Sequence, residues 1–361
     1  MKIKIAYIIP TLNLGGAEKQ QINILNCIDT QIFDVKIFVL KNEVQLISQI
    51  KNKNINIEIF NIYSINNIRE LLKFFVSIIK YKPDIIHSHM YNANLLARLL
   101  KIFLPKSKII NHIHGMSKWL SFRKLFLDKF TSFLVDKFIV VSQESFDLRI
   151  KRESYSKEKL FLLMNSVNIQ INRVNTNNIK KDYFNIGMAS RLIAIKNIKG
   201  AIYMVKFLLD RGINVKLKIA GDGLEKDNLM NYAINLGIDK SVEFYGFINK
   251  IEEFYEEIDI YCISSFTEDM PLSVLEAMML GKPIIASKVG GIPNLLNKFK
   301  NCSVMISDFF NDEELNKVLH FIKNLNIINC KIKLQNFAEN NFSNKIYCKK
   351  LTKIYLDMIK Q

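Results

Sequence analysis

The chain is poor in cysteine, and its few cysteines are scattered. Five occur in 361 residues: Cys27, Cys262, Cys302, Cys330 and Cys348, with no Cys-x-x-Cys spacing. Metal sites held by cysteine usually show such close pairs, and secreted disulfide scaffolds usually hold an even number. The pattern therefore argues against a cysteine metal site and predicts free, buried thiols in a reducing compartment.

Long apolar runs are also lacking. Nowhere do about 18 uninterrupted apolar residues occur, which is the length that a membrane-spanning helix needs. Residues Lys2–Ala6 alternate polar and apolar side chains, as a strand does, and lack the pattern of a cleavable signal. We therefore expect a cytoplasmic protein whose attachment to the inner face of the cytoplasmic membrane, if any, is peripheral.

Acidic residues are outnumbered: 34 Asp and Glu stand against 51 Lys and Arg, which gives a net charge of +17. Residues 1–175 hold 26 basic and 13 acidic side chains (+13), whereas residues 176–361 hold 25 and 21 (+4). The first half is therefore expected to face an anionic partner such as lipid or nucleic acid. No Asp-x-Asp occurs, so a divalent ion held by paired carboxylates is not expected.

What the chain has in quantity is short apolar runs that alternate with helical segments. This alternation predicts an α/β protein in which parallel sheets are covered on both faces. It restarts after a polar linker at 170–182, so we expect two Rossmann-like domains, residues 1–168 and 169–344. The strand-like runs of the first half are Lys2–Ile9, Asp34–Leu40, Ile55–Phe60, Asp84–His89, Ser107–His114, Lys137–Ser142 and Leu160–Met164.

Residues 258–293 read as strand, loop, helix, strand and glycine turn in close succession. Glu268 precedes the helix, and Glu276 lies inside it among apolar neighbours. Pro271 suits the first turn of this helix, and Gly281 suits its left-handed end. A helix N-terminus favours an anion such as phosphate, and a buried carboxylate needs a partner. On spacing alone, a sugar–phosphate site fits no better than a core corner in which Glu276 pairs with a lysine and Glu268 is solvated.

This stretch resembles the Glu-x7-Glu signature of retaining glycosyltransferases with the GT-B fold, family 4, including the Glu-Ala-Met, Gly-Lys-Pro and Gly-Gly-Ile-Pro runs. The resemblance implies two Rossmann-like domains that face each other across a cleft, with a C-terminal helix at about 345–361 packing back on the first domain. It also implies that Glu276 binds the donor ribose and that Glu268 is catalytic at the transferred sugar. The start of the helix would bind the donor through Met270, Pro271, Leu272 and Ser273.

Further positions in the first half match the same family. Gly15 and Gly16 resemble its Gly-Gly-x-Glu loop, which lies against the donor phosphates and sugar, although a tight turn would look alike. His114 resembles its histidine at the transferred sugar and is taken as catalytic. His87-Ser88-His89 has the spacing of a metal pair but lacks a nearby third ligand, so we expect an ordinary strand end and a structural role for His112.

The second half carries the remaining donor positions. Arg191 and Lys196 resemble the family's Arg-x4-Lys clamp on the diphosphate, whereas two loop cations alone would more often be solvated. Phe247 lies in the segment that resembles the one beside the nucleobase. Asp269-Met270-Pro271 stands where many relatives have Gly-Phe-Gly, which leaves the identity of the sugar open.

Residues 117–137 interleave basic side chains with Trp, Phe and Leu. The basic ones are Lys118, Arg123, Lys124 and Lys129. An interfacial amphipathic helix has this composition, and a core helix with a solvated basic face fits it equally. Given the charge of the first half, we expect the Lys118–Lys129 region to contact an anionic membrane surface.

The sequence thus predicts a retaining glycosyltransferase. It would move a hexose or N-acetylhexosamine from a nucleotide sugar, by default UDP-linked, to a glycan or lipid-linked acceptor in cell-surface polysaccharide assembly. Neither a cofactor, a metal nor a nucleic-acid partner is expected. Two alternatives stay open: a nucleotide-sugar epimerase of the same fold, and a non-catalytic basic module that binds membrane or nucleic acid.

Overall fold

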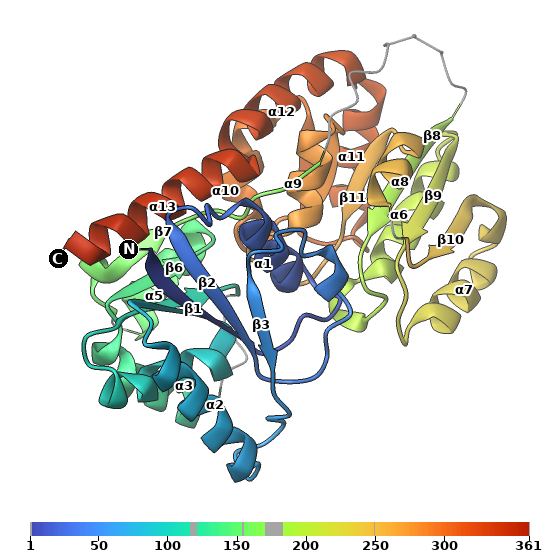
Figure 1. Ribbon diagram of the computed structural model, residues 1–361. Coiled ribbons are helices and arrows are strands. Elements are labelled where there is room, and N and C mark those ends of the chain that lie inside the picture. Colours follow the sequence, from blue (N-terminus) through green and yellow to red (C-terminus); the bar gives the residue numbers. More distant parts are fainter. Residues whose placement is uncertain (1, 116–120, 154, 170–182, 249, 361) are drawn as a thin grey trace. The chain divides into compact units, whose positions relative to one another are not determined.

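The computed structural model describes residues 2–115, 121–153, 155–169, 183–248 and 250–360 (Figure 1). They form two compact units, each described by itself. Unit 1 contains Met1–Ser166 and Ser343–Gln361, and unit 2 contains Val167–Phe342. The boundaries expected after residues 168 and 344 lie two residues from this division.

Unit 1 is built on a parallel sheet of seven strands in the order β3-β2-β1-β4-β5-β6-β7 (Figure 1). All seven runs expected as strands form strands, so the predicted α/β architecture is confirmed. The strands are β1 (Ile3–Ile9), β2 (Phe33–Val39), β3 (Asn56–Ile59), β4 (Ile85–His89), β5 (Lys108–Ile113), β6 (Lys137–Val140) and β7 (Leu160–Leu162). The α-helices are α1 (Gly16–Cys27), α2 (Ile68–Tyr81), α3 (Met90–Phe103), α4 (Phe122–Thr131), α5 (Gln143–Glu153) and α13 (Asn344–Lys360).

The central strand β1 has side chains in two separate cores. Ile5, Tyr7 and Ile9 pack with α1 and α13 on one face, whereas Ala6 and Ile8 pack with α2 and α3 on the other. All five are fully buried. A parallel strand covered on both faces requires an unbroken apolar run, and the part of β1 from Ile5 to Ile9 provides one. The C-terminal helix is thus part of unit 1.

A disulfide joins Cys27, at the end of α1, to Cys348 in α13. The expectation of free thiols is therefore wrong for these two residues. They are 321 positions apart in the chain, so no local spacing could indicate the pairing. The two helices pack against each other and bring them together. Cys262, Cys302 and Cys330 are free and buried, as expected.

Unit 2 repeats the pattern with six parallel strands in the order β10-β9-β8-β11-β12-β13 (Figure 1). Aliphatic side chains of the central strands and of α6, α7 and α11 form its core. The strands are β8 (Phe184–Ala189), β9 (Val215–Ala220), β10 (Val242–Gly246), β11 (Ile260–Ile263), β12 (Ile284–Ser287) and β13 (Ser303–Ile306). The α-helices are α6 (Ile198–Leu209), α7 (Lys226–Asn235), α8 (Ile251–Glu257), α9 (Leu272–Met279), α10 (Ile292–Leu296), α11 (Asp312–Lys323) and α12 (Ile327–Phe342).

Each sheet has one point at which the strand order reverses. In unit 1 the chain runs from β1 outward to β3 and then returns to β4 on the other side of β1. In unit 2 it runs from β8 outward to β10 and returns to β11 beside β8. Open α/β sheets bind ligands outside the carboxyl ends of the strands at such switch points. A ligand site is therefore expected at the loops after β1 and β4 in unit 1 and after β8 and β11 in unit 2.

Helix α4 lies almost wholly at the surface of unit 1. Phe122, Phe126 and Phe130 recur at every fourth position, and their exposed fractions are 83%, 63% and 66%. Asp128 is buried on the opposite face, where Arg98 of α3 binds it at 2.9 Å. A core helix would bury its phenylalanines, so the core helix that the sequence left open as an alternative for this segment is wrong. Across the described residues, no helix is both long and apolar enough to cross a membrane.

Candidate active site

The loop that follows β8 carries the two predicted diphosphate ligands, Arg191 and Lys196. Gly221 sets its path: a Cβ there would lie 1.9 Å from the Ser190 carbonyl oxygen, and the residue has a φ of +135°. Only glycine allows this conformation and this close approach. The loop is therefore pressed against the glycine turn after β9, with the Arg191 side chain exposed and Lys196 partly buried.

Lys196 meets the predicted catalytic acid. Its Nζ lies 2.6 Å from Glu268 Oε1, and the Ser265 hydroxyl donates to the same oxygen at 2.7 Å. The exposed fractions of the Lys196 and Glu268 side chains are only 20% and 11%. An ion pair so largely shielded from water is stronger than one at a surface. A cation and a carboxylate are thus in direct contact at the switch point of unit 2.

Hydrogen bonds join the loop after β8 to the loop after β11. The Ser264 hydroxyl donates to the Asn197 carbonyl at 2.8 Å, and the Phe266 N–H donates to the Ile195 carbonyl at 2.9 Å. Asn197 has a left-handed conformation (φ 48°) and is the N-cap of α6. The Lys196–Glu268 contact therefore rests on a fixed backbone as well as on charge.

Helix α9 forms as predicted and places the second acid. It begins after Pro271, and the chain turns away at Gly281, whose φ is +68°. Glu276 is only 8% exposed, and the Tyr255 hydroxyl lies 3.2 Å from its Oε2 and 2.9 Å from the Ser273 carbonyl. Burial, and next the charge of Glu276, raise the pKa of Tyr255 well above its usual value. Tyr255 comes from α8, and nothing in the sequence indicated this partner.

The start of α9 holds the other predicted donor ligands of this segment. Met270, Pro271 and Leu272 are buried, and Ser273 is half-buried. The Gly291 N–H donates to the Asp269 carbonyl at 3.0 Å, so the Gly-Gly-Ile-Pro turn supports the segment from behind. The N-terminus of α9, the positive end of its dipole, begins four positions after Glu268 in the chain and favours an anion.

Phe247 lies farther away within unit 2. It follows β10, the edge strand of the sheet, and β9 separates that strand from β8. Its side chain is 54% exposed, so it does not belong to the core of unit 2.

In unit 1, Gly15 is the N-cap of α1 and Gly16 is its first residue, in the turn that follows β1. A Cβ on Gly15 would lie 2.3 Å from Glu18 Oε2, whereas one on Gly16 would meet open space. Glu18 accepts a hydrogen bond from the Thr11 hydroxyl at 3.1 Å and so lies over the turn. Gly15 is half-buried beside the Glu18 carboxylate, whereas Gly16 is exposed, so the turn is most open to a ligand at Gly16.

His114 follows β5 and belongs to a stack of histidines. His89 Nδ1 lies 2.9 Å from His114 Nε2, and the ring centroids of His112 and His114 are 4.2 Å apart. Arg149 donates to the Gly115 carbonyl at 2.8 Å and so fixes the backbone next to His114. Burial lowers the pKa of His114 to about 4, so the ring is neutral at pH 7.

The expectation that His87 and His89 lack a third ligand is wrong. One ring nitrogen from each of His87, His89 and His112 lies within 4.8 Å of the other two, because β4 and β5 are neighbours and pair His89 with His112. Each half of this cluster is visible in the sequence as His-x-His. The strand register that joins the halves is not.

The predicted residues therefore fall into two sets, one in each unit. Lys196, Glu268 and the start of α9 come together at the switch point of unit 2. In unit 1, Gly15 and Gly16 follow β1 at the switch point, whereas His114 follows β5, which β4 separates from β1. Sequence reasoning missed Ser265, which is three positions before Glu268, and it missed Tyr255.

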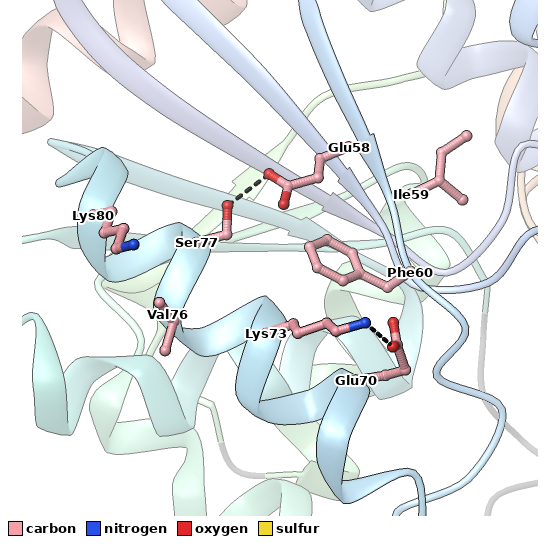
Figure 2. A pocket seen from close by; sticks show the side chains of 8 residues that line it. All are labelled: Glu58, Ile59, Phe60, Glu70, Lys73, Val76, Ser77 and Lys80. Carbon is pink, nitrogen blue, oxygen red and sulfur yellow. Dashed lines mark hydrogen bonds and ion pairs between the residues drawn. The ribbon is translucent and has the colours of Figure 1, made fainter.

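Figure 2 shows a pocket of about 410 Å³ in unit 1, between β3 and α2. Four of its five polar side chains pair with one another: Lys73 binds Glu70 at 2.6 Å, and the Ser77 hydroxyl donates to Glu58 at 2.6 Å. None of the predicted site residues lines it. We assign it no part in the chemistry.

The fold is that of the GT-B glycosyltransferases. HepE of Anabaena in complex with UDP superimposes with a TM-score of 0.83 at 18% identity, over 98% of this chain and 100% of that one. The lipopolysaccharide outer core galactosyltransferase WaaB superimposes with a TM-score of 0.78 at 17% identity, over 99% and 100%. At these identities the likeness shows the fold.

The family follows from the sequence itself. Residues 14–170 match the model of Glycosyltransferase Family 4, and residues 170–342 match that of Glycosyl transferases group 1. The chain belongs to this family of GT-B glycosyltransferases and is an enzyme. It is 24% identical to an Escherichia coli UDP-Gal:alpha-D-GlcNAc-diphosphoundecaprenol alpha-1,3-galactosyltransferase, over 99% of this chain and 98% of that protein. It is 22% identical to the capsular polysaccharide glycosyltransferase CapM of Staphylococcus aureus, over 82% of each chain.

Proposed function

We propose that the enzyme is retaining and transfers a hexose or N-acetylhexosamine from a UDP-linked donor to a lipid-linked glycan. The observation that carries the proposal is the 2.6 Å contact between Lys196 and Glu268 at the switch point of unit 2. A nucleotide sugar joins an anionic diphosphate to a sugar rich in hydroxyl donors. A lysine beside a carboxylate suits that junction, with the cation for the phosphate and the acid for the sugar.

The transition state requires stabilisation of the diphosphate as it leaves. Arg191 offers a bidentate guanidinium, Lys196 a point charge, and the N-terminus of α9 its backbone N–H groups. The sequence contains no Asp-x-Asp to hold a divalent ion at the diphosphate. We therefore assign charge stabilisation to these protein groups, with no cofactor.

The two acids bind the sugars on either side of the diphosphate. Glu276 accepts hydrogen bonds from the ribose, and Glu268 holds the hydroxyls of the transferred sugar and stabilises positive charge at its anomeric carbon. The anomeric C–O bond to the diphosphate breaks while the acceptor oxygen bonds to the same face. The acceptor proton passes to the departing phosphate oxygen. His114, neutral at pH 7, contributes a hydrogen bond to the transferred sugar.

Relatives support the choice of substrates. The name of the Escherichia coli relative specifies UDP-Gal as donor and a diphosphoundecaprenol-linked acceptor. A Campylobacter jejuni relative, 24% identical over 76% of this chain, is an N-acetyl-D-galactosaminyltransferase whose acceptor is also linked to PP-undecaprenol. We infer a polyprenyl-diphosphate acceptor and a place in polysaccharide assembly.

A lipid-linked acceptor calls for contact with a membrane, and α4 supplies a suitable surface. Its exposed phenylalanines alternate with Arg123, Lys124 and Lys129, all exposed. Aromatic rings can enter the interface while basic groups meet anionic headgroups, at about 1 kcal/mol per basic residue. Lys118 lies outside the described residues. We propose that α4 attaches unit 1 peripherally to an anionic leaflet.

The experiment is a transfer assay with purified enzyme, four UDP-sugars (Glc, Gal, GlcNAc and GalNAc) and a polyprenyl-diphosphate-linked GlcNAc acceptor. NMR of the product reports the anomeric configuration. We expect α-linked product from an α-linked donor, and none without acceptor. An inverted linkage would refute the retaining mechanism, and an altered sugar formed without acceptor would favour the epimerase.

A further inference from the structure

The buried nitrogens of the histidine cluster point to a ligand that no part of the proposed transfer uses. His87, His89 and His112 have no exposed surface. Within the described part of the chain, Nε2 of His87, Nε2 of His89 and both ring nitrogens of His112 have no hydrogen-bond partner. Buried polar atoms are nearly always paired, because an unpaired one loses its hydrogen bonds to water without gaining others. Three such rings with nitrogens within 4.8 Å of one another suggest a common partner.

We propose that His87, His89 and His112 form a three-histidine site for one divalent transition-metal ion, with zinc as the reference ion. Ligand nitrogens around a tetrahedral zinc ion are about 3.4 Å apart, given Zn–N bonds of about 2.0–2.1 Å. The rings are stacked: the centroids of His87 and His112 are 5.4 Å apart at an interplanar angle of 7°, and those of His87 and His89 are 4.4 Å apart at 25°. Because the nitrogen lone pairs lie in the ring planes, an ion binds once the rings turn so that one nitrogen of each faces it. A fourth position remains for water, as in other three-histidine zinc sites.

The opposite nitrogens of two of these rings are already held. His87 Nδ1 lies 2.6 Å from the Tyr355 hydroxyl, which also contacts the Tyr7 hydroxyl. His89 Nδ1 lies 2.9 Å from His114 Nε2. When each Nδ1–H donates to its partner, the lone pairs of the two Nε2 atoms are left for a metal. Histidine ligands of metal sites are oriented in this way by an outer hydrogen bond.

The chemistry of the ligands selects the class of ion. The cluster offers only imidazole nitrogens, which suit zinc, copper, nickel or iron, whereas magnesium and calcium require oxygen ligands. The site is therefore distinct in kind from a carboxylate-held ion at the donor diphosphate.

The consequence for the enzyme is positional. An ion bound to His87 and His89 of β4 and to His112 of β5 would tie the carboxyl ends of the two strands together. His89 would then hold His114, through Nδ1, in one orientation. His114 itself is not a ligand in this arrangement.

The test uses the tag-free, full-length enzyme after removal of metal with EDTA. Titration with CoCl₂ is followed by visible absorption, and zinc content after dialysis is measured by mass spectrometry. We expect one ion per chain and a rise in Tm with zinc but none with magnesium. His112→Leu should weaken binding by about 100-fold or more, and Tyr355→Phe by about 10- to 100-fold. His320→Leu removes the fifth histidine, which is exposed on α11, and should change nothing.

Three results would overturn the proposal. The first is wild-type enzyme that retains no zinc after dialysis and shows no shift in Tm, which would mean neutral stacked rings without an ion. The second is a folded His112→Leu enzyme that binds cobalt as the wild type does. The third is loss of the ion in His320→Leu. Because the wild-type Tm and metal content need no variant, the proposal can fail even if the cluster variants do not fold.

Discussion

Lys196 Nζ and Glu268 Oε1 lie 2.6 Å apart at the switch point of unit 2, and each limits what the other can do. The Glu268 carboxylate is paired with the Lys196 ammonium group, which a diphosphate would also contact. A bound donor therefore competes with Glu268 for Lys196, and the carboxylate is then available to the sugar hydroxyls. The Ser265 hydroxyl donates to the same carboxylate oxygen and so helps to fix the Glu268 side chain.

Glu268→Gln should lower kcat by about 10²- to 10³-fold, since it removes a charge that stabilises the transition state. The fold should persist, because glutamine keeps the size of the side chain. Glu256→Gln is the matched control, an exposed acid on α8 whose loss should leave kcat unchanged. Steady-state transfer kinetics with saturating donor provide the measurement. Wild-type kcat in Glu268→Gln would remove this residue from the catalytic step.

Tyr255→Phe should weaken both the fold and the donor site. The hydroxyl lies 3.2 Å from Glu276 Oε2, and its loss should lower the free energy of unfolding by about 1 kcal/mol. With one oriented donor gone, Glu276 should hold the ribose less well, so UDP affinity should fall several-fold. Urea denaturation and calorimetry measure the two effects. Tyr232→Phe, on α7, serves as the control, and equal effects from both variants would disprove a specific role.

Much of the fold could be predicted from local pattern, and the misses share one cause. The unbroken apolar run of β1 and the Pro271–Gly281 frame of α9 are local signals, and both elements formed as expected. The Tyr255–Glu276 contact, the joining of His89 to His112, and the Cys27–Cys348 disulfide are long-range. They depend on helix packing and strand register, which no spacing in the sequence reports. The Lys196–Glu268 contact was predicted in part: the family resemblance identified each residue, but not the contact between them.

Replacement of Phe122, Phe126 and Phe130 by serine should abolish binding to anionic vesicles. These side chains supply the apolar part of α4, and the basic residues alone give weak, salt-dependent attachment. Sedimentation with phosphatidylglycerol vesicles at low and physiological salt measures the effect. Phe310→Ser, which alters a phenylalanine of unit 2 that is 44% exposed, should bind as the wild type does. Wild-type enzyme that ignores such vesicles at low salt would refute the membrane role.

Thiol counting should report the disulfide. Under denaturing conditions without reductant, three of the five cysteines should react, namely Cys262, Cys302 and Cys330. All five should react after reduction, and the Tm should fall because Cys27 and Cys348 no longer tie α1 to α13. Five reactive thiols in enzyme purified under oxidising conditions would show that the two cysteines do not pair.

Calorimetric titration of UDP into wild type, Lys196→Ala and Glu268→Gln tests the central claim most directly. If Lys196 grips the diphosphate while Glu268 competes for it, Lys196→Ala should weaken UDP binding by about 10- to 100-fold, as expected for a hydrogen bond between charged groups. Glu268→Gln should bind UDP as tightly as the wild type or more tightly, and Lys199→Ala, an exposed lysine on α6, should match the wild type. Undiminished UDP affinity in Lys196→Ala, or a loss in Glu268→Gln as large as that expected for Lys196→Ala, would contradict the account.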